Sequence, residues 1–506
     1  MPSSENTRLA KNTIFLYFRM ILVMGVTLFT SRVILNALGV NDYGIYNVVG
    51  GMVSLFSVIS GSLSSAISRF ITFELGTGNF EKLKQIFSTA MSIQIILSIL
   101  CLIIGGSLGF WFLNTKMNIA SERIYSANWV LFFSIITFII SLLSVPYNAE
   151  IIAHEKMKTF AYVGIIEVML KLGVAYLIYA FKEDKLIFYS LLMAGVSLIL
   201  RIIYGIYCSK HFEECKTSFK FNKKIFKEMS GFAGWNFIGT ASTVIRDQGN
   251  NIILNLFLGT VVNAAYSIGM QVSNAAYSFS QNFMTAINPQ ITKTFAQNNH
   301  DKLISLIYRG SRFSFFLLWI IALVLLFNTK MIITLWLKEV PEYTVTFVRL
   351  FLIFVLSESI SQPLITSQLA SGKIKNYQIC VGGSKFLNLP ISYLLLKLGF
   401  SPYVTVIVAI IISIGMLFMR FYFLKGILGL KIKFFILNSL VPIIYVTTFS
   451  LILSYFSIFK LPDNLGFLFI KSAIILIIGT LSIYILGCTK FEREYINSKI
   501  HSLFNK

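Results

Sequence analysis

Charged residues are scarce in this chain: Asp, Glu, Lys and Arg make up 13% of its 506 residues, whereas 56% are hydrophobic. Soluble domains carry roughly 25% charged residues. A soluble fold of this size could not hide so much apolar surface, and the mean hydropathy of +0.76 agrees. The composition therefore predicts an all-α protein that crosses a membrane many times.

Cysteine and histidine are too few, and too scattered, to indicate chemistry. The five cysteines show no paired spacing, which argues against disulfides and against a cysteine-bound metal. Only four histidines are present, and His154-Glu155 lacks the second histidine of a zinc-protease motif. We therefore expect neither a metal site nor a catalytic residue.

The chain also lacks a Walker phosphate-binding loop, so we expect it not to hydrolyse ATP and not to be an enzyme. No bound cofactor is expected, and a proton or sodium gradient is left as the energy source. Residues 1–11 do not have the pattern of a cleavable signal. The first apolar segment is therefore expected to remain as a membrane anchor.

Apolar stretches of about 20 residues recur from one end of the chain to the other, which is the length a helix needs to cross ~30 Å of hydrocarbon. We predict about fourteen spanning helices. They cover residues 12–35, 44–72, 85–113, 124–146, 160–181, 186–208, 230–257, 262–290, 304–327, 343–370, 376–397, 401–424, 434–456 and 465–487.

Lys and Arg outnumber Asp and Glu by 22, but most of them lie in alternate connecting segments such as "KHFEECKTSFKFNKKIFK" at 210–227. Basic loops stay on the cytoplasmic side of a membrane, so this asymmetry places both termini in the cytoplasm. The excess positive charge then faces anionic lipid headgroups, and nucleic acid is not expected as a partner.

The chain repeats itself at an offset of about 220 residues. "LGVNDYGIYNVVGG" (38–51) aligns with "LGTVVNAAYSIGM" (258–270), with Gly39 over Gly259, and "SVPYNAEIIAHEKMK" (144–158) aligns with "SQPLITSQLASGKIK" (361–375) at an offset of 217. The offset spans six helices, so we predict two six-helix lobes related by a parallel pseudo-two-fold axis, with a substrate site between them. The predicted parts are an N-lobe (1–208), a basic cytoplasmic linker (209–229), a C-lobe (230–425), and a peripheral helix pair with a cytoplasmic tail (426–506).

Polar residues interrupt several predicted spans, above all at Arg246 and Asp247 in the helix over 230–257. A charge at mid-membrane costs roughly 2.5–3.5 kcal/mol even on the lenient insertion scale. Asp247 and Asn251 lie one turn apart and share a helix face. The two charges are tolerable if they pair with each other and merely fix packing, or if they face water. We favour a water-filled cavity.

Other charges within the spans complete the candidate site. Lys171 follows Glu167 by four residues, so the two could neutralise each other. Lys385 aligns with Val168, one turn from Lys171, so each lobe offers a lysine at nearly the same depth. Arg19, Arg32, Arg69 and Arg420 lie nearer helix ends and could extend to the interface. The candidates for binding an anionic group are Lys171, Lys385, Arg246 and Arg32; those for ion coupling are Asp247, Glu358 and Glu167; and those lining the cavity are Ser60, Ser64, Asn251, Gln271, Asn274 and Asn282.

Three stretches carry a family resemblance: "NTIFLYFRMILVMGVTLFTSRVILNALGVNDYGIYNVVGG" (12–51), "SSAISRFITFELGTGNFEKLKQIF" (64–87) and "PYNAEIIAHEKMKTFAYVGIIEVMLKLG" (146–173). They resemble the bacterial polysaccharide-unit (O-antigen) flippases of the multidrug/oligosaccharidyl-lipid/polysaccharide (MOP) exporter superfamily. The resemblance implies a location in the bacterial inner membrane, alternating access, and a monomeric transport unit. It also implies an oligosaccharide linked to undecaprenyl diphosphate as substrate, and the polymerase and glycosyltransferases of the same pathway as partners.

Three other functions remain open. A multidrug exporter of the same superfamily would need a net acidic cavity for organic cations. A flippase for the lipid-linked peptidoglycan precursor is hardly distinguishable by sequence. A membrane polysaccharide polymerase would predict a large external loop or a soluble catalytic segment, and the sequence has neither.

Overall fold

The computed structural model describes residues 2–504 except 55, 118, 182, 217–220, 338–339, 459–460 and 463. Over these residues the secondary structure is helical, without a strand. Among the residues that the structure describes, twelve helices are long and apolar enough to cross a membrane, and a bent pair, Asn41–Val53 with Ser57–Thr77, makes thirteen. One of the twelve, Lys223–Ala296, is 74 residues long and contains the two predicted spans 230–257 and 262–290. If the helix Lys223–Ala296 is counted as two spans, the total rises from thirteen to fourteen, the number predicted from the sequence.

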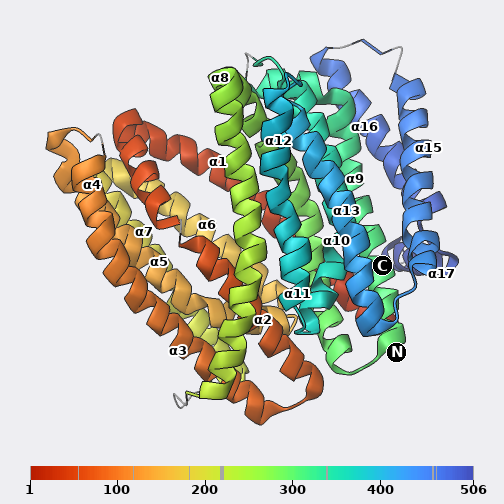
Figure 1. Ribbon diagram of the computed structural model, residues 1–506, viewed down its shortest axis with the longest axis horizontal. Helices are drawn as coiled ribbons and strands as arrows, with labels where there is room; N and C mark the ends of the chain where they lie inside the picture. Colours follow the sequence, from red (N-terminus) through yellow and green to blue (C-terminus); the bar gives the residue numbers. More distant parts are fainter. Residues whose placement is uncertain are drawn as a thin grey trace. The chain divides into compact units, whose positions relative to one another are not determined.

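The chain forms two compact units, Met1–Thr240 with Thr285–Asn298 and Ala241–Met284 with Asn299–Lys506. The described elements that lie wholly in the first unit are shown from red to yellow in Figure 1. They are α1 (Pro2–Ser54), α2 (Ser57–Thr77), α3 (Phe80–Ile104), the π-helical turn η1 (Gly105–Gly109), α4 (Phe110–Lys116), η2 (Ser121–Arg123), α5 (Ile124–Ala153), α6 (Met157–Ala180), α7 (Lys185–His211) and η3 (Glu213–Cys215).

The helix α8 (Lys223–Ala296) contributes to both units, and the remaining elements belong to the second. These are α9 (His300–Leu337), α10 (Thr344–Ala370), α11 (Lys375–Tyr377), η4 (Gln378–Gly382), η5 (Lys385–Leu387), α12 (Asn388–Lys397), α13 (Val404–Leu428), α14 (Ile432–Phe435), η6 (Ile436–Leu440), α15 (Val441–Ile458), α16 (Leu465–Ser482), η7 (Ile483–Gly487) and α17 (Lys490–Phe504). Of the predicted linker over 209–229, residues 217–220 lie outside the described residues.

The backbone repeats where the sequence repeats. Gly39 within α1 has φ 80° and ψ 167°, and Gly259 within α8 has φ 81° and ψ −171°. This region of backbone space is essentially restricted to glycine. Each glycine marks the point where two helices meet, in agreement with the separate spans predicted before and after it. The predicted span 44–72, in contrast, is bent by 52° at the break after Val53.

Two further pairs of positions share a left-handed backbone. Gly78 and Asn298, 220 residues apart, have φ 76° and 54°, and Glu155 and Gly372, 217 residues apart, have φ 57° and 72°. The residue after each member of the first pair is an asparagine that caps the next helix through its side chain: Asn79 accepts from Lys82 N at 3.1 Å, and Asn299 from Lys302 N at 3.2 Å. The repeat therefore extends from sequence to local conformation.

Each unit has its own buried core. In the first, α5 packs on α7 and α1 packs on α6. In the second, α10 lies between α9 and α13, and α15 and α16 pack on each other and on α9. Trp319 on α9 donates from Nε1 to Ser450 Oγ on α15 at 2.9 Å, and Arg312 donates to both carboxylate oxygens of Glu492 at 2.6 and 2.7 Å, which fixes α17 to α9.

The two special glycines generate a stability prediction. Gly39→Ala and Gly259→Ala should each lower the free energy of unfolding by about 1–3 kcal/mol, because an L-residue is strained at these angles. A Cβ at either position would meet no atom within 4 Å, so the effect isolates the backbone. Gly25→Ala in α1 and Gly415→Ala in α13 are matched controls, since both glycines are helical and equally open. Thermal unfolding in detergent is the measurement, and equal shifts for test and control variants would contradict the explanation.

Candidate functional site

Five charged side chains converge inside the second unit, although they come from four separate segments of the chain. Arg246 and Asp247 lie on α8, Glu358 on α10, Lys385 at the start of η5, and Arg420 on α13. All four segments fall within candidate membrane spans. The cluster therefore brings together Lys385, Arg246, Asp247 and Glu358, which the sequence nominated separately.

Arg246 and Asp247 pair with each other. The guanidinium donates from Nε to Asp247 Oδ1 at 2.8 Å, and Nη2 lies 2.7 Å from the same oxygen. The Cζ atom of the guanidinium lies 4.8 Å from the ring centre of Phe354 on α10. The Arg246 side chain is 10% exposed and the Asp247 side chain 28%. Pairing is thus present, and the carboxylate keeps an accessible side.

Lys385 lies where the helical path loses its regularity. The predicted span 376–397 passes from α11 through the π-helical turn η4 and the 3₁₀ turn η5 before α12 begins. Gly382 and Gly383 lie at this irregularity, and Ser384 Oγ donates to the Cys380 carbonyl at 2.5 Å; both features are common where helices kink. From this position, Lys385 Nζ donates to Thr243 Oγ1 on α8 at 2.8 Å.

Glu358 takes its partners from α13. The hydroxyl of Ser413 donates to Glu358 Oε1 and itself accepts from Ser357 Oγ at 2.9 Å. Arg420 Nη2 lies 4.0 Å from Glu358 Oε2. Arg420 is only 1% exposed, and its Nε and Nη1 have no hydrogen-bond partner among the described residues. The site thus holds a buried cation whose donors are not all used.

The balance of charge in this cluster is positive. Three cations (Arg246, Lys385 and Arg420) face two carboxylates (Asp247 and Glu358), which leaves one positive charge in excess when all are ionised. Buried charge without a counter-charge is costly in a medium of low dielectric. An anionic group would balance this cluster, whereas an organic cation would add to the excess.

Arg420 was missed by sequence reasoning, which treated it as a residue able to extend to the membrane interface. It instead points into the protein, because Glu358 supplies a partner from a helix 62 positions earlier in the chain. One signal could have found it: Arg201 precedes Arg420 by 219 residues, close to the repeat offsets of 217 and 220. Arg201 stacks on Tyr147, with its Cζ 4.2 Å from the ring centre.

The candidates in the first unit behave differently. Lys171 Nζ donates to Glu167 Oε1 at 2.6 Å, and the two side chains are 38% and 34% exposed. This is the self-neutralising pair that the sequence left open as an alternative. Arg32 lies on α1 with an exposed side chain.

The polar candidates divide into two groups. Asn251 accepts from Asn263 Nδ2 at 2.9 Å and from Ser267 Oγ at 3.3 Å, which ties together the two helices that meet at Gly259. Asn282 Nδ2 donates to the Ser278 carbonyl one turn earlier at 2.8 Å. Of the other four polar candidates, Gln271 and Asn274 are exposed, and Ser60 and Ser64 are partly buried.

The chain matches two known protein families. The family of polysaccharide biosynthesis proteins matches residues 9–295, more than half of the chain. The chain belongs to this family. The MatE family also matches residues 249–394. This range includes Glu358 and Lys385 and begins shortly after Arg246 and Asp247 on α8. Together with its apolar helices, these matches make the chain a multi-pass membrane protein.

The chain also resembles individual proteins. It is 20% identical over 311 residues to the uncharacterized membrane protein EpsK of Bacillus subtilis (strain 168), and the match covers 60% of each chain. An outward-facing multidrug resistance MATE family transporter of the MOP superfamily superposes with a TM-score of 0.70 at 10% identity, covering 83% of this chain and 96% of that one. A MOP superfamily transporter from Pyrococcus furiosus gives 0.69 at 11% identity with the same coverage. These likenesses establish a transporter fold.

The pairing of Glu358 with Arg420 can be tested by stability. Arg420→Met should lower the free energy of unfolding by about 3 kcal/mol, because it leaves a buried carboxylate without its counter-charge. Adding Glu358→Gln should recover much of that loss, since the double variant removes both charges. Arg349→Met, at an exposed position on α10, is the matched control. Additive losses in the double variant, measured by thermal unfolding in detergent, would argue against the pairing.

Proposed function

We propose that this protein is a flippase that moves a polyprenyl (undecaprenyl) diphosphate-linked oligosaccharide from the cytoplasmic to the outer leaflet of the bacterial inner membrane by alternating access. The product would serve the synthesis of O-antigen, capsule or exopolysaccharide. The observation that carries this proposal is the excess of positive charge in the cluster of Arg246, Lys385 and Arg420 with Asp247 and Glu358.

Elementary energetics explain why such a substrate needs this cluster. A diphosphate cannot enter hydrocarbon unaided, because the loss of its hydration costs many kcal/mol. A lysine and arginines replace part of that hydration, and they are held in place beforehand by Thr243, Asp247 and Glu358. The isoprenoid chain needs no such help, since it can stay in the bilayer throughout.

Accessibility within the cluster also favours a binding role for Lys385. Arg420 is almost fully buried, whereas Lys385 and Glu358 are only partly buried and Asp247 keeps an exposed side. We therefore assign Lys385 to the anion and Arg420 to holding Glu358, and we keep Arg246, whose side chain is 10% exposed and paired with Asp247, as the second residue for the anion. Asp247 and Glu358 remain the candidates for coupling to a proton or sodium gradient, and Lys171 with Glu167 form a second, neutral pair.

A multidrug exporter is the second candidate, because the MatE family matches residues 249–394. For the Pyrococcus furiosus transporter, the reverse polarity of its binding pocket suggests a different function. Pocket polarity is likewise the criterion here. Three cations against two carboxylates oppose an organic cation as substrate and favour an anion.

Lys385→Gln and Arg246→Gln should each abolish surface polysaccharide in cells that depend on this protein, because each removes a positive charge from the anion site. Lys397→Gln, an exposed lysine at the end of α12, should leave the polysaccharide unchanged. The measurement is the amount of surface polysaccharide relative to protein in the membrane, with a homogeneous elution profile in detergent as proof of folding. Full polysaccharide with both folded variants would refute the assignment. Drug resistance that follows expression of the protein would support the exporter instead.

A further inference from the structure

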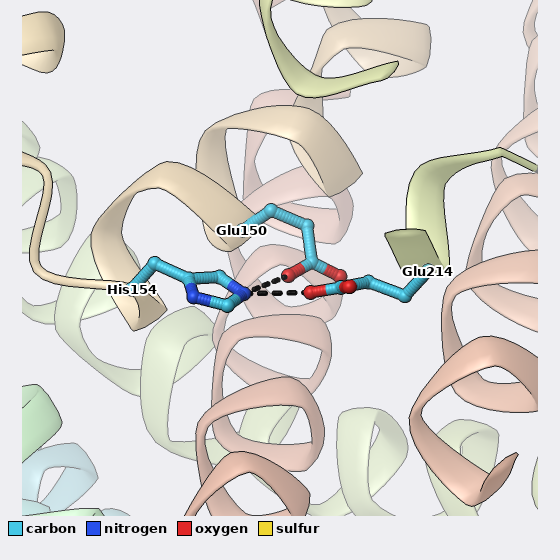
Figure 2. Close-up of side chains that lie close together, drawn as sticks. All are labelled: Glu150, His154 and Glu214. Atoms are coloured by element: carbon cyan, nitrogen blue, oxygen red, sulfur yellow. Dashed lines mark hydrogen bonds and ion pairs between the residues drawn. The ribbon is translucent and has the colours of Figure 1, made fainter. Parts of the chain in front are cut away.

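Glu150, His154 and Glu214 form a compact cluster in the first unit that the transport proposal does not use (Figure 2). Glu150 and His154 lie one turn apart at the end of α5, so their side chains share a face. Glu214 comes from the 3₁₀ turn η3, which follows α7. By the orientation predicted from the basic loops, this end of the unit faces the cytoplasm.

One imidazole nitrogen faces both carboxylates. His154 Nε2 lies 2.6 Å from Glu214 Oε1 and 3.6 Å from Glu150 Oε2. One atom of each residue lies within 4.8 Å of the others, and Figure 2 shows the three polar groups pointing toward one another. The His154 ring is held in its plane by stacking on Phe212, with ring centres 4.2 Å apart at an angle of 13°.

Glu150 is the unusual member of the cluster. It is 0% exposed, and neither carboxylate oxygen has a hydrogen-bond partner among the described residues. A buried carboxylate without such partners needs a proton or a cation nearby. Its carboxylate is aimed into the space that also faces His154 Nε2 and Glu214, so the cluster itself is where a cation would satisfy it.

The surroundings favour positive charge at this point. Two carboxylates, those of Glu150 and Glu214, face one imidazole there. The cluster also lies at the C-terminal end of α5, which runs from Ile124 to Ala153, and just after that of α7, which ends at His211. Helix C-termini carry unsatisfied carbonyls and stabilise cations.

We propose that Glu150, His154 and Glu214 form a binding site for one divalent transition-metal ion of the Zn²⁺ type. An imidazole nitrogen and carboxylate oxygens are the ligands that such ions take, at about 2.0–2.2 Å. A tetrahedral ion with those bonds sets its ligands roughly 3.3 Å apart, between the two distances of 2.6 and 3.6 Å found at Nε2. The ion takes the place of the proton between His154 and Glu214. Water fills the fourth position, reached from the side on which the His154 side chain is 24% exposed.

The ion would fasten the start of the connecting segment to its own unit. Glu214 lies in η3, before the residues that lead into α8, whereas Glu150 lies in a candidate membrane-spanning helix and His154 directly follows that helix. A bond from each to one ion restrains η3 more tightly than one hydrogen bond does. The sequence concealed this arrangement, because Glu214 is 60 positions from His154.

Zinc binding to the purified full-length protein tests the proposal. After chelator treatment, loading with Zn²⁺ and desalting, wild type should retain one ion per chain, measured by elemental analysis. Glu150→Gln and Glu214→Gln should each raise the Kd for Zn²⁺ by more than about 100-fold, because loss of a direct ligand exceeds the 10–100-fold effect of losing an outer partner. Glu150→Gln relieves a buried charge with little change of shape, so this variant should stay folded.

Neighbouring residues supply matched controls. Glu213→Gln changes the exposed residue beside Glu214, and His300→Gln changes an exposed histidine of the second unit; neither should alter the Kd. Cys208 and Cys215 are also buried in this unit. Because neither is one of the three proposed ligands, Cys208→Ser should leave zinc binding intact. Zinc binding that survives Glu150→Gln but not Cys208→Ser would overturn the site. A wild-type protein that binds no more Zn²⁺ than folded Glu150→Gln would show that a proton alone satisfies Glu150.

Discussion

The constraint on which the whole second unit depends is that charge inside a membrane protein must be matched where it is buried. Arg246 meets this requirement with its neighbour Asp247, and Arg420 with Glu358, which lies on another helix. Lys385 is held by a hydroxyl rather than by a carboxylate. The two carboxylates stabilise Arg246 and Arg420, and because the cations outnumber the carboxylates the cluster remains incompletely neutralised. This combination of order and residual charge is what a binding site for an anion needs.

The sequence predicted the features that local physics determines. Apolar runs of spanning length located the helices, and the internal repeat pointed to Gly39 and Gly259, whose backbone angles confirm their equivalence. Arg246 and Asp247 attracted notice because adjacent charges in an apolar helix are expensive. In each case the deciding interaction acts within one helix or between neighbours in sequence, so the order of the residues was sufficient.

What the sequence could not provide were pairings between distant segments. Arg420 looked able to reach the interface until Glu358 was seen beside it, and His154 looked isolated until Glu214 was brought to it by η3. The irregular path around Lys385 was equally hidden, because a π turn and a 3₁₀ turn leave only a glycine pair as their trace.

The surplus of one positive charge in the cluster has an electrical consequence for the proposed cycle. A doubly negative diphosphate would convert a site of charge +1 into one of charge −1. Because the cell interior is negative, the membrane potential would favour the inward-facing state of the empty site and the outward-facing state of the loaded site. A unit charge that crosses the whole membrane gains about 2.3 kcal/mol for every 100 mV of potential. Both half-reactions of export would run downhill in the resting field, so the transporter would be electrogenic even without a coupled ion.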